Sequence, residues 1–107
     1  MDFNEYQNKA LRTAGVKEKD GLVLNGVMGL AGESGECIDI MKKHLFQGHE
    51  LAAAKLLDEL GDVLWYIAIT AAGLDLTLDE VATYNIEKLN KRYPQGFEAQ
   101  RSIDREE

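Results

Sequence analysis

The apolar positions of this chain recur with helical spacing and predict four helices. These run over about residues 3–13, 22–46, 50–72 and 77–92. Gly48 and Gly73 follow the second and third helices, where glycine readily closes a helix. Thr77 and Glu80 form a capping box at the start of the fourth helix. The only proline, Pro94, lies beyond that helix and interrupts none of the four.

Helices of this length, joined by short connections, predict an all-α fold: an antiparallel bundle of about four helices. The third helix is apolar around most of its circumference, a pattern typical of helices buried on more than one side. One short chain has too few helices to cover it. We therefore expect oligomerisation to complete the bundle, as a homo-dimer or homo-tetramer. We expect residues 1–97 to form the helical domain and 98–107 a polar C-terminal tail.

The net charge and the cysteine content limit the kinds of molecule that the protein is expected to bind. The 107 residues carry a formal net charge of −7, which disfavours general binding to nucleic acid. It does not exclude a single nucleotide, because a bound cation can reverse the local sign. Cys37 is the only cysteine, so no intrachain disulfide can form and no Cys/His cluster suits zinc. Without a signal-peptide pattern or a membrane-length apolar run, we expect a cytoplasmic protein with no membrane partner.

Two pairs of acids carry the candidate chemistry. Glu33 and Glu36 lie three residues apart on the small and apolar face of the second helix, and Glu59 and Asp62 repeat this spacing on an apolar face of the third. Burying a carboxylate costs several kcal/mol, and these faces offer no Arg or Lys as a partner. A hard divalent cation with oxygen ligands solves the problem, and Mg²⁺ or Mn²⁺ fits a set made only of carboxylates.

A structural alternative must be weighed against a metal site. Two glutamates three residues apart are common on solvated helix faces, so one such pair carries little weight. Two pairs on consecutive helices, both on apolar faces, favour a site. Four glycines add to this, because each lowers helix stability by about 1 kcal/mol relative to alanine. Close helix approach or room for a ligand would explain their positions, which are Gly26, Gly29, Gly32 and Gly35.

Residues 29–36, with the sequence GLAGESGE, and residues 58–66, with the sequence DELGDVLWY, resemble the MazG-like all-α nucleoside triphosphate pyrophosphohydrolases. The signature of that family is Glu-Glu-x-x-Glu, a spacer, and then Glu-x-x-Asp. The closing segment, residues 85–97, is similar as well, and the resemblance covers roughly residues 6–97. One position departs from the signature. Gly32 stands where the family has the first acid of the leading pair, so a role for that acid is not carried over.

The resemblance implies hydrolysis of (deoxy)nucleoside triphosphates to the monophosphate and pyrophosphate, in house-cleaning or control of nucleotide pools. It implies Mg²⁺ as the cofactor, with Mn²⁺ as a substitute. The four residues expected to bind the metal and carry catalysis are Glu33, Glu36, Glu59 and Asp62. An alternative is a non-catalytic metal-binding or interaction module of the same fold.

Further residues are candidates for contact with the substrate. Asn85, Lys88 and Arg92 share one face of the fourth helix and match the closing motif, so we expect them to contact phosphates. The alternative is a solvated basic face near a helix C-terminus, where cations are favourable anyway. Lys43 lies one turn beyond the acidic stripe and is a weaker candidate. Tyr66 could contact the nucleoside, or it could pack in the core with its hydroxyl satisfied.

Overall fold

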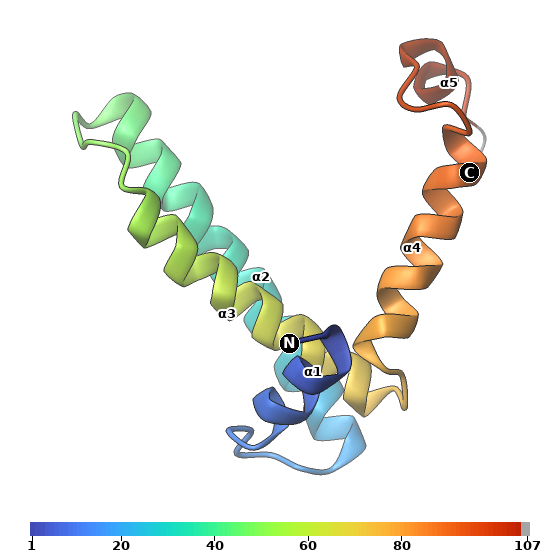
Figure 1. The fold of residues 1–107 in the computed structure, drawn as a ribbon. Helices are drawn as coiled ribbons and strands as arrows, with labels where there is room; N and C mark the ends of the chain where they lie inside the picture. The colour runs from blue at the N-terminus through green and yellow to red at the C-terminus, as the bar shows by residue number, and fades with distance from the viewer. Residues whose placement is uncertain (106–107) are drawn as a thin grey trace.

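The computed structural model describes residues 1–105 of the chain, and its regular elements are helices (Figure 1). They are α1 (Phe3–Leu11), α2 (Lys19–Phe46), α3 (Ala53–Gly73), α4 (Leu78–Arg92) and α5 (Ala99–Ile103). No strand occurs within the described part of the chain, and the predicted all-α class is confirmed. The short helix α5 lies in the polar tail, of which residues 106–107 are outside the described residues.

The framework of the fold is an antiparallel hairpin of α2 and α3 (Figure 1). Two of the glycines noted in the sequence allow these helices to approach closely. A side chain at Gly26 would collide with Thr70, and one at Gly29 would collide with the ring of Tyr66. Their helical cost is therefore offset by tight packing, and the ring of Tyr66 occupies the space that Gly29 leaves.

The predicted helix ends differ from the observed ones by two or three residues at three places. The first helix ends at Leu11 rather than near residue 13. The second helix begins at Lys19 rather than near residue 22, because the Leu22 amide donates to the Glu18 carbonyl and adds a turn. The third begins at Ala53 rather than near residue 50. Thr77 caps α4 as predicted, since its Oγ1 accepts from the Glu80 amide at 3.1 Å.

The core lies at the base of the hairpin, where α1 packs across α3. Ala10, Ala68 and Ile69 are buried there, and the other buried apolar side chains are Ala14, Leu22, Ala71 and Leu78. Trp65 bridges the two parts of this core and donates from Nε1 to the Ala10 carbonyl at 3.1 Å and to Thr13 Oγ1 at 2.8 Å. The core is small and leaves the far half of the hairpin without cover from the same chain.

One buried polar side chain fixes where α4 leaves the hairpin. Gln7 of α1 donates from Nε2 to the carbonyls of Ala68, at 3.1 Å, and Leu76, at 3.0 Å. Its Oε1 accepts from the Leu78 amide, the first of α4, at 3.1 Å. These bonds hold α1, α3 and the turn before α4 together, and the axes of α3 and α4 bend by 100° at that turn. As a result α4 rises as a separate arm, and the molecule has the shape of a V (Figure 1).

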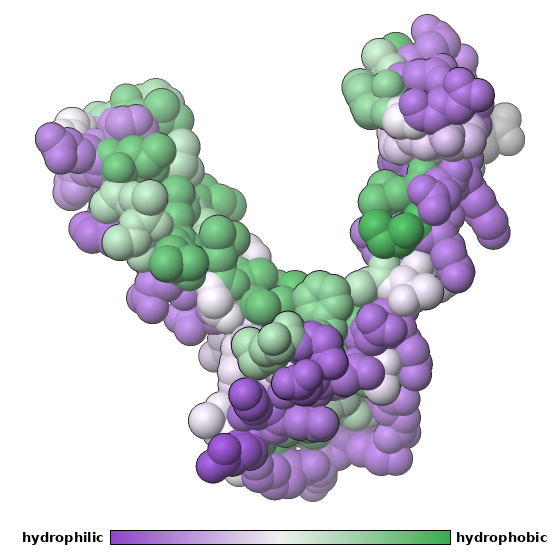
Figure 2. Space-filling model, in the orientation of Figure 1, coloured by the Kyte–Doolittle hydropathy of each residue, from purple (hydrophilic) through white to green (hydrophobic). Residues whose placement is uncertain are grey.

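Much apolar surface stays exposed on the two arms (Figure 2). Leu24, Leu57, Leu60 and Tyr84 each expose more than half of their surface. Contiguous apolar surface of this kind marks interaction sites. No single described helix has both the length and the apolar composition needed to cross a membrane. Helices α3 and α4 taken together have that length and composition, but a bend of 100° separates them.

We predict that Gln7→Ala lowers the free energy of unfolding by about 2–4 kcal/mol, because it leaves buried carbonyl and amide groups unpaired. Denaturant titration followed by circular dichroism measures this change. Asn8→Ala is the matched control, since Asn8 is the next residue of α1 and is exposed. Equal stability of the two variants would contradict the role assigned to Gln7.

Candidate metal centre

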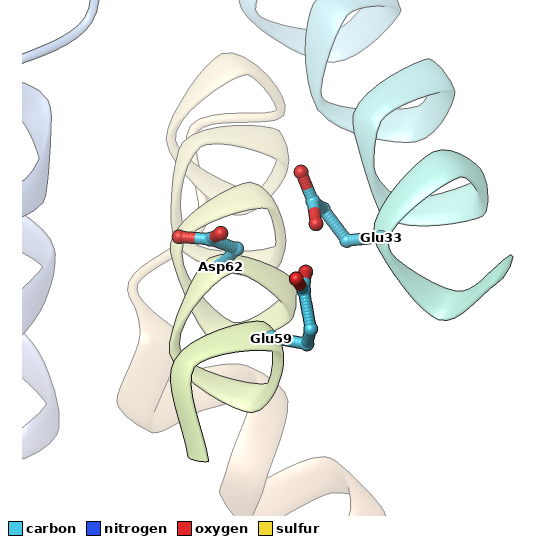
Figure 3. Close-up of side chains that lie close together, drawn as sticks. All are labelled: Glu33, Glu59 and Asp62. Carbon is cyan, nitrogen blue, oxygen red and sulfur yellow. The ribbon is translucent and has the colours of Figure 1, made fainter. Parts of the chain in front are cut away.

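Three of the four predicted acids converge between the two helices of the hairpin. One carboxylate oxygen each of Glu33, Glu59 and Asp62 lies within 4.8 Å of the others. Glu33 reaches across from α2 toward the two acids of α3 (Figure 3). Glu33 and Glu59 are half-buried and Asp62 is exposed, so the cluster sits at an open edge of the hairpin.

Two glycines beside the acids of α2 are not explained by close helix packing. A side chain at Gly32 or Gly35, which precede Glu33 and Glu36 on α2, would meet no neighbouring atom of the described chain within 4 Å. Close approach of α3 therefore accounts for Gly26 and Gly29 but not for these two glycines. Room for a ligand stays a prediction at Gly32 and Gly35.

Electrostatic repulsion within the cluster is strong. The Glu33 carboxyl group, by hydrogen bonding and by its charge, raises the pKa of Glu59 to about 7; desolvation and the charges of Asp58 and Asp62 act in the same direction. Oε2 of Glu59 is buried, with no hydrogen-bond partner among the described residues. The cluster thus lacks positive charge at the point where its negative charge is most crowded.

This donor set fits a hard divalent cation. Mg²⁺ and Mn²⁺ prefer carboxylate oxygens over nitrogen and sulfur, and three such oxygens lie within 4.8 Å of one another. Oε2 of Glu59, which is buried without a hydrogen-bond partner among the described residues, also indicates a site for a cation. Glu33, Glu59 and Asp62 are therefore the residues that would hold the ion.

The fourth acid, Glu36, lies one turn further along α2, is exposed and stands outside the three-acid cluster. With Glu59 it borders a hollow of about 210 Å³ between α2 and α3, near the connection that joins them. Lys43 borders the same hollow, and its Nζ lies 2.9 Å from Oδ2 of Asp39. The hydrogen bond from Lys43 to Asp39, together with the charges of Asp39 and Glu36, raises the pKa of Lys43.

Two side chains near the cluster were not singled out from the sequence. Lys55 borders the hollow one turn before Glu59, and the angular count that placed the acids could have found it. Tyr6 of α1 lies close enough to Asp62 for that charge to add to desolvation, the main cause, in raising the pKa of the tyrosine. No spacing rule reveals Tyr6, because its position depends on how α1 packs across α3.

The remaining predicted residues lie elsewhere. Tyr66 is half-buried and packs edge-on against Trp65, with ring centroids 5.0 Å apart. This matches the packing alternative, and a nucleoside contact stays a prediction. Asn85, Lys88 and Arg92 lie on α4, the other arm of the V, and the structure does not bring them to the acids of their own chain (Figure 1).

Comparison with known proteins bears on the same segment. The family model described as the MazG nucleotide pyrophosphohydrolase domain matches residues 24–97, which include all four acids and the whole of α4. A curated relative, the Gene 37 protein of Mycobacterium phage L5, is 40% identical over 73 residues, covering 64% of this chain and 64% of the relative. No solved structure matches.

We predict that stability without metal falls as pH rises from about 4.5 to about 7. The folded-state pKa of Glu59, about 7, lies above its ordinary value of 4.5. Proton binding therefore favours the folded state below 4.5, and this contribution is lost as pH rises through 7. Chemical denaturation in EDTA over this range, compared with Glu59→Gln, measures it. The free energy of unfolding of the variant should equal that of the native chain at pH 4.5 and exceed it at pH 8. If the two free energies change with pH in parallel, the raised pKa of Glu59 is refuted.

Proposed function

This chain belongs to the family of MazG nucleotide pyrophosphohydrolase domains, and on that premise we propose that it hydrolyses (deoxy)nucleoside triphosphates to the monophosphate and pyrophosphate with Mg²⁺. The observation that carries the proposal is the convergence of Glu33, Glu59 and Asp62 inside the matched segment, with one glutamate oxygen unpartnered. A bound Mg²⁺ would neutralise the phosphates, polarise the phosphorus under attack and lower the pKa of a water molecule.

The residues of the chain divide this work. Glu33, Glu59 and Asp62 would hold the ion, which would supply positive charge for the phosphates of the substrate. Glu36 is exposed and outside the cluster, which supports it as the carboxylate that would accept the proton of the attacking water. Lys43 borders the adjoining hollow, which supports it as the cation that would balance the charge of a phosphate group. Positioning and charge stabilisation supply most of the rate in phosphoryl transfer.

The proposal extends to the setting of the reaction. The exposed apolar surface of both arms supports a homo-oligomer, a dimer or a tetramer. A net charge of −7 supports a small nucleotide as the partner rather than nucleic acid. House-cleaning or pool control in the cytoplasm, and Mn²⁺ as a substitute for Mg²⁺, remain predictions from the family resemblance.

One observation favours a second function. Gly32 replaces an acid of the family signature, and a site with fewer carboxylates could bind metal without turning over substrate. A non-catalytic metal-binding or interaction module would then keep the fold and the cluster while lacking activity. Pyrophosphate release separates the two functions.

We predict pyrophosphate release from at least one member of a panel of ribo- and deoxyribonucleoside triphosphates with Mg²⁺. Asp62→Asn and Glu36→Gln should each lower the rate at least 100-fold, because they remove a metal ligand and the proposed base. Asp20→Asn, at the start of α2 and far from the cluster, is the matched control and should keep full activity. If the folded protein releases pyrophosphate from none of the triphosphates, the proposed hydrolysis is wrong and the non-catalytic function is favoured.

We also predict that Mg²⁺ at ten times its dissociation constant raises the melting temperature by about 6 °C, since it binds only the folded state. Asp62→Asn should abolish this shift, whereas Asp20→Asn should keep it. Calorimetry with and without Mg²⁺ measures the effect, and equal shifts in both variants would place the ion elsewhere.

A further inference from the structure

Helix α4 has little packing within its own chain to hold it. Among the described residues of α4, Leu78 alone is buried, whereas Tyr84 and Ile86 are more than half exposed. Its contacts with other helices are mainly with α1 and α3, near the base of the V (Figure 1). A helix of 15 residues without tertiary packing is only marginally stable in water. Interactions other than apolar packing must therefore help to keep α4 helical.

The N-terminal end of α4 is capped largely by α1. The first four amides of a helix have no partner inside the helix. The Leu78 amide donates to Oε1 of Gln7 at 3.1 Å, and the Asp79 amide donates to Oδ1 of Asn4 at 3.2 Å. The next amide donates to the capping threonine described above. Two of these three acceptors thus belong to α1, more than seventy residues earlier in the sequence.

The two side chains of α1 that cap α4 differ in their surroundings. Asn4 and Gln7 lie three residues apart, so they share one face of α1. Gln7 is buried and also binds carbonyl groups of the core, whereas Asn4 is exposed. Asn4 can therefore be replaced without opening the core, and its bond to α4 can be tested on its own.

The C-terminal end of α4 is capped by the tail of the chain. Arg101 of α5 donates from Nε to the Arg92 carbonyl at 2.7 Å and from Nη2 to the Lys91 carbonyl at 3.5 Å. The last carbonyls of a helix have no partner inside it and carry partial negative charge, so a guanidinium group is favourable there. Arg101 supplies this cation from outside the helix, nine residues beyond Arg92.

A closed turn brings α5 back to this end of α4. Gly96 has a φ of +94°, which glycine adopts without strain, and its amide donates to the Tyr93 carbonyl at 3.1 Å. The rings of Tyr93 and Phe97 pack together with their centroids 5.3 Å apart. These contacts fix the turn over residues 93–97, so the start of the tail is held where Arg101 reaches α4.

We propose that α1 and the tail form a clamp on α4, made by Asn4, Gln7 and Arg101, which keeps this helix folded from both of its ends. Helices unfold from their ends, where backbone groups lack partners, so a cap at each end protects the turns next to it. Asn4 and Arg101 are then positioning residues for the predicted phosphate contacts on α4, which are Asn85, Lys88 and Arg92. This positioning role rests on the proposed function, whereas the clamp itself does not.

The clamp sets the fraction of molecules in which α4 is helical. A ligand that requires the helix binds with an apparent dissociation constant equal to its intrinsic value divided by that fraction. Weaker caps therefore weaken the binding of a triphosphate. Once the triphosphate is bound, α4 is helical again and the chemical step is unchanged. Loss of the clamp thus raises KM and leaves kcat as it was.

Hydrogen exchange of the full chain, measured by mass spectrometry, tests the clamp without any need for activity. Asn4→Ala should speed exchange over residues 81–85 by about fivefold, since loss of a helix cap costs about 1 kcal/mol and 1.4 kcal/mol is tenfold. Arg101→Ala should speed exchange over residues 88–92 by about threefold, because it removes a cation and two donors from the C-terminus. Exchange in α3 should stay the same.

Two further variants test whether the bond of Asn4 is the cause. Asn8→Ala is the matched control, since Asn8 is another exposed asparagine of α1. Alanine favours a helix at both positions, so faster exchange in α4 cannot result from a weaker α1. Asn4→Asp should restore native exchange, because a carboxylate oxygen still accepts from the Asp79 amide.

Gln100→Ala is the matched control for Arg101→Ala. Gln100 precedes Arg101 on α5, and its Nε2 donates to Oδ2 of Asp104 at 2.8 Å, within the tail. Its loss should leave exchange in α4 unchanged. Unchanged exchange in α4 after either Asn4→Ala or Arg101→Ala would overturn the clamp. Equal acceleration in α2, α3 and α4 would overturn it as well, because that result indicates a general loss of stability.

Steady-state kinetics tests the positioning role. In the double variant Asn4→Ala/Arg101→Ala, KM for a triphosphate with Mg²⁺ should rise about fivefold, with kcat unchanged within about twofold. The double control Asn8→Ala/Gln100→Ala should keep both values. A fall in kcat at unchanged KM would overturn the positioning role. If the native chain releases no pyrophosphate, the proposed function and the positioning role are both wrong, and hydrogen exchange still decides the clamp.

Discussion

Repulsion between the carboxylates of Glu33 and Glu59 is the constraint on which the site depends. The approach of α2 and α3 at Gly26 and Gly29 forces these groups together, since tight packing along one half of the hairpin sets the helix spacing for the other. The raised pKa of Glu59 expresses the resulting cost. A proton on Glu59 relieves this repulsion at low pH, and a divalent cation would relieve it at neutral pH. The packing that stabilises the base of the hairpin thus also crowds the carboxylates further along it.

Gln7 determines the direction in which α4 leaves the hairpin. Its three hydrogen bonds hold the turn between α3 and α4 and keep α4 from folding back along the hairpin. A single chain consequently has its acids on one arm and its closing motif on the other. This separation also leaves apolar side chains of α2 and α3 exposed, so the uncovered apolar surface and the distance between the acids and α4 have one common cause.

Local patterns in the sequence predicted much of this. Hydrophobic spacing placed the four main helices, and the angular count brought Glu33, Glu59 and Asp62 onto facing surfaces, because both depend only on helical geometry. The direction of α4 was not predictable. It depends on Gln7, whose partners Leu76 and Leu78 lie about seventy residues away. Tyr6 was missed for the same reason, and the position of Glu36 outside the cluster reflects how the two helices cross.

The raised pKa of Glu59 links two ways of lowering the charge of the cluster. A proton on Glu59 reduces the repulsion among the carboxylates, and a divalent cation held by the same carboxylates would reduce it as well. Such a cation would bind the ionised form of Glu59, so the proton and the cation would compete for this side chain. The packing that brings Glu33 and Glu59 together therefore sets the pH range in which the cluster would accept a cation.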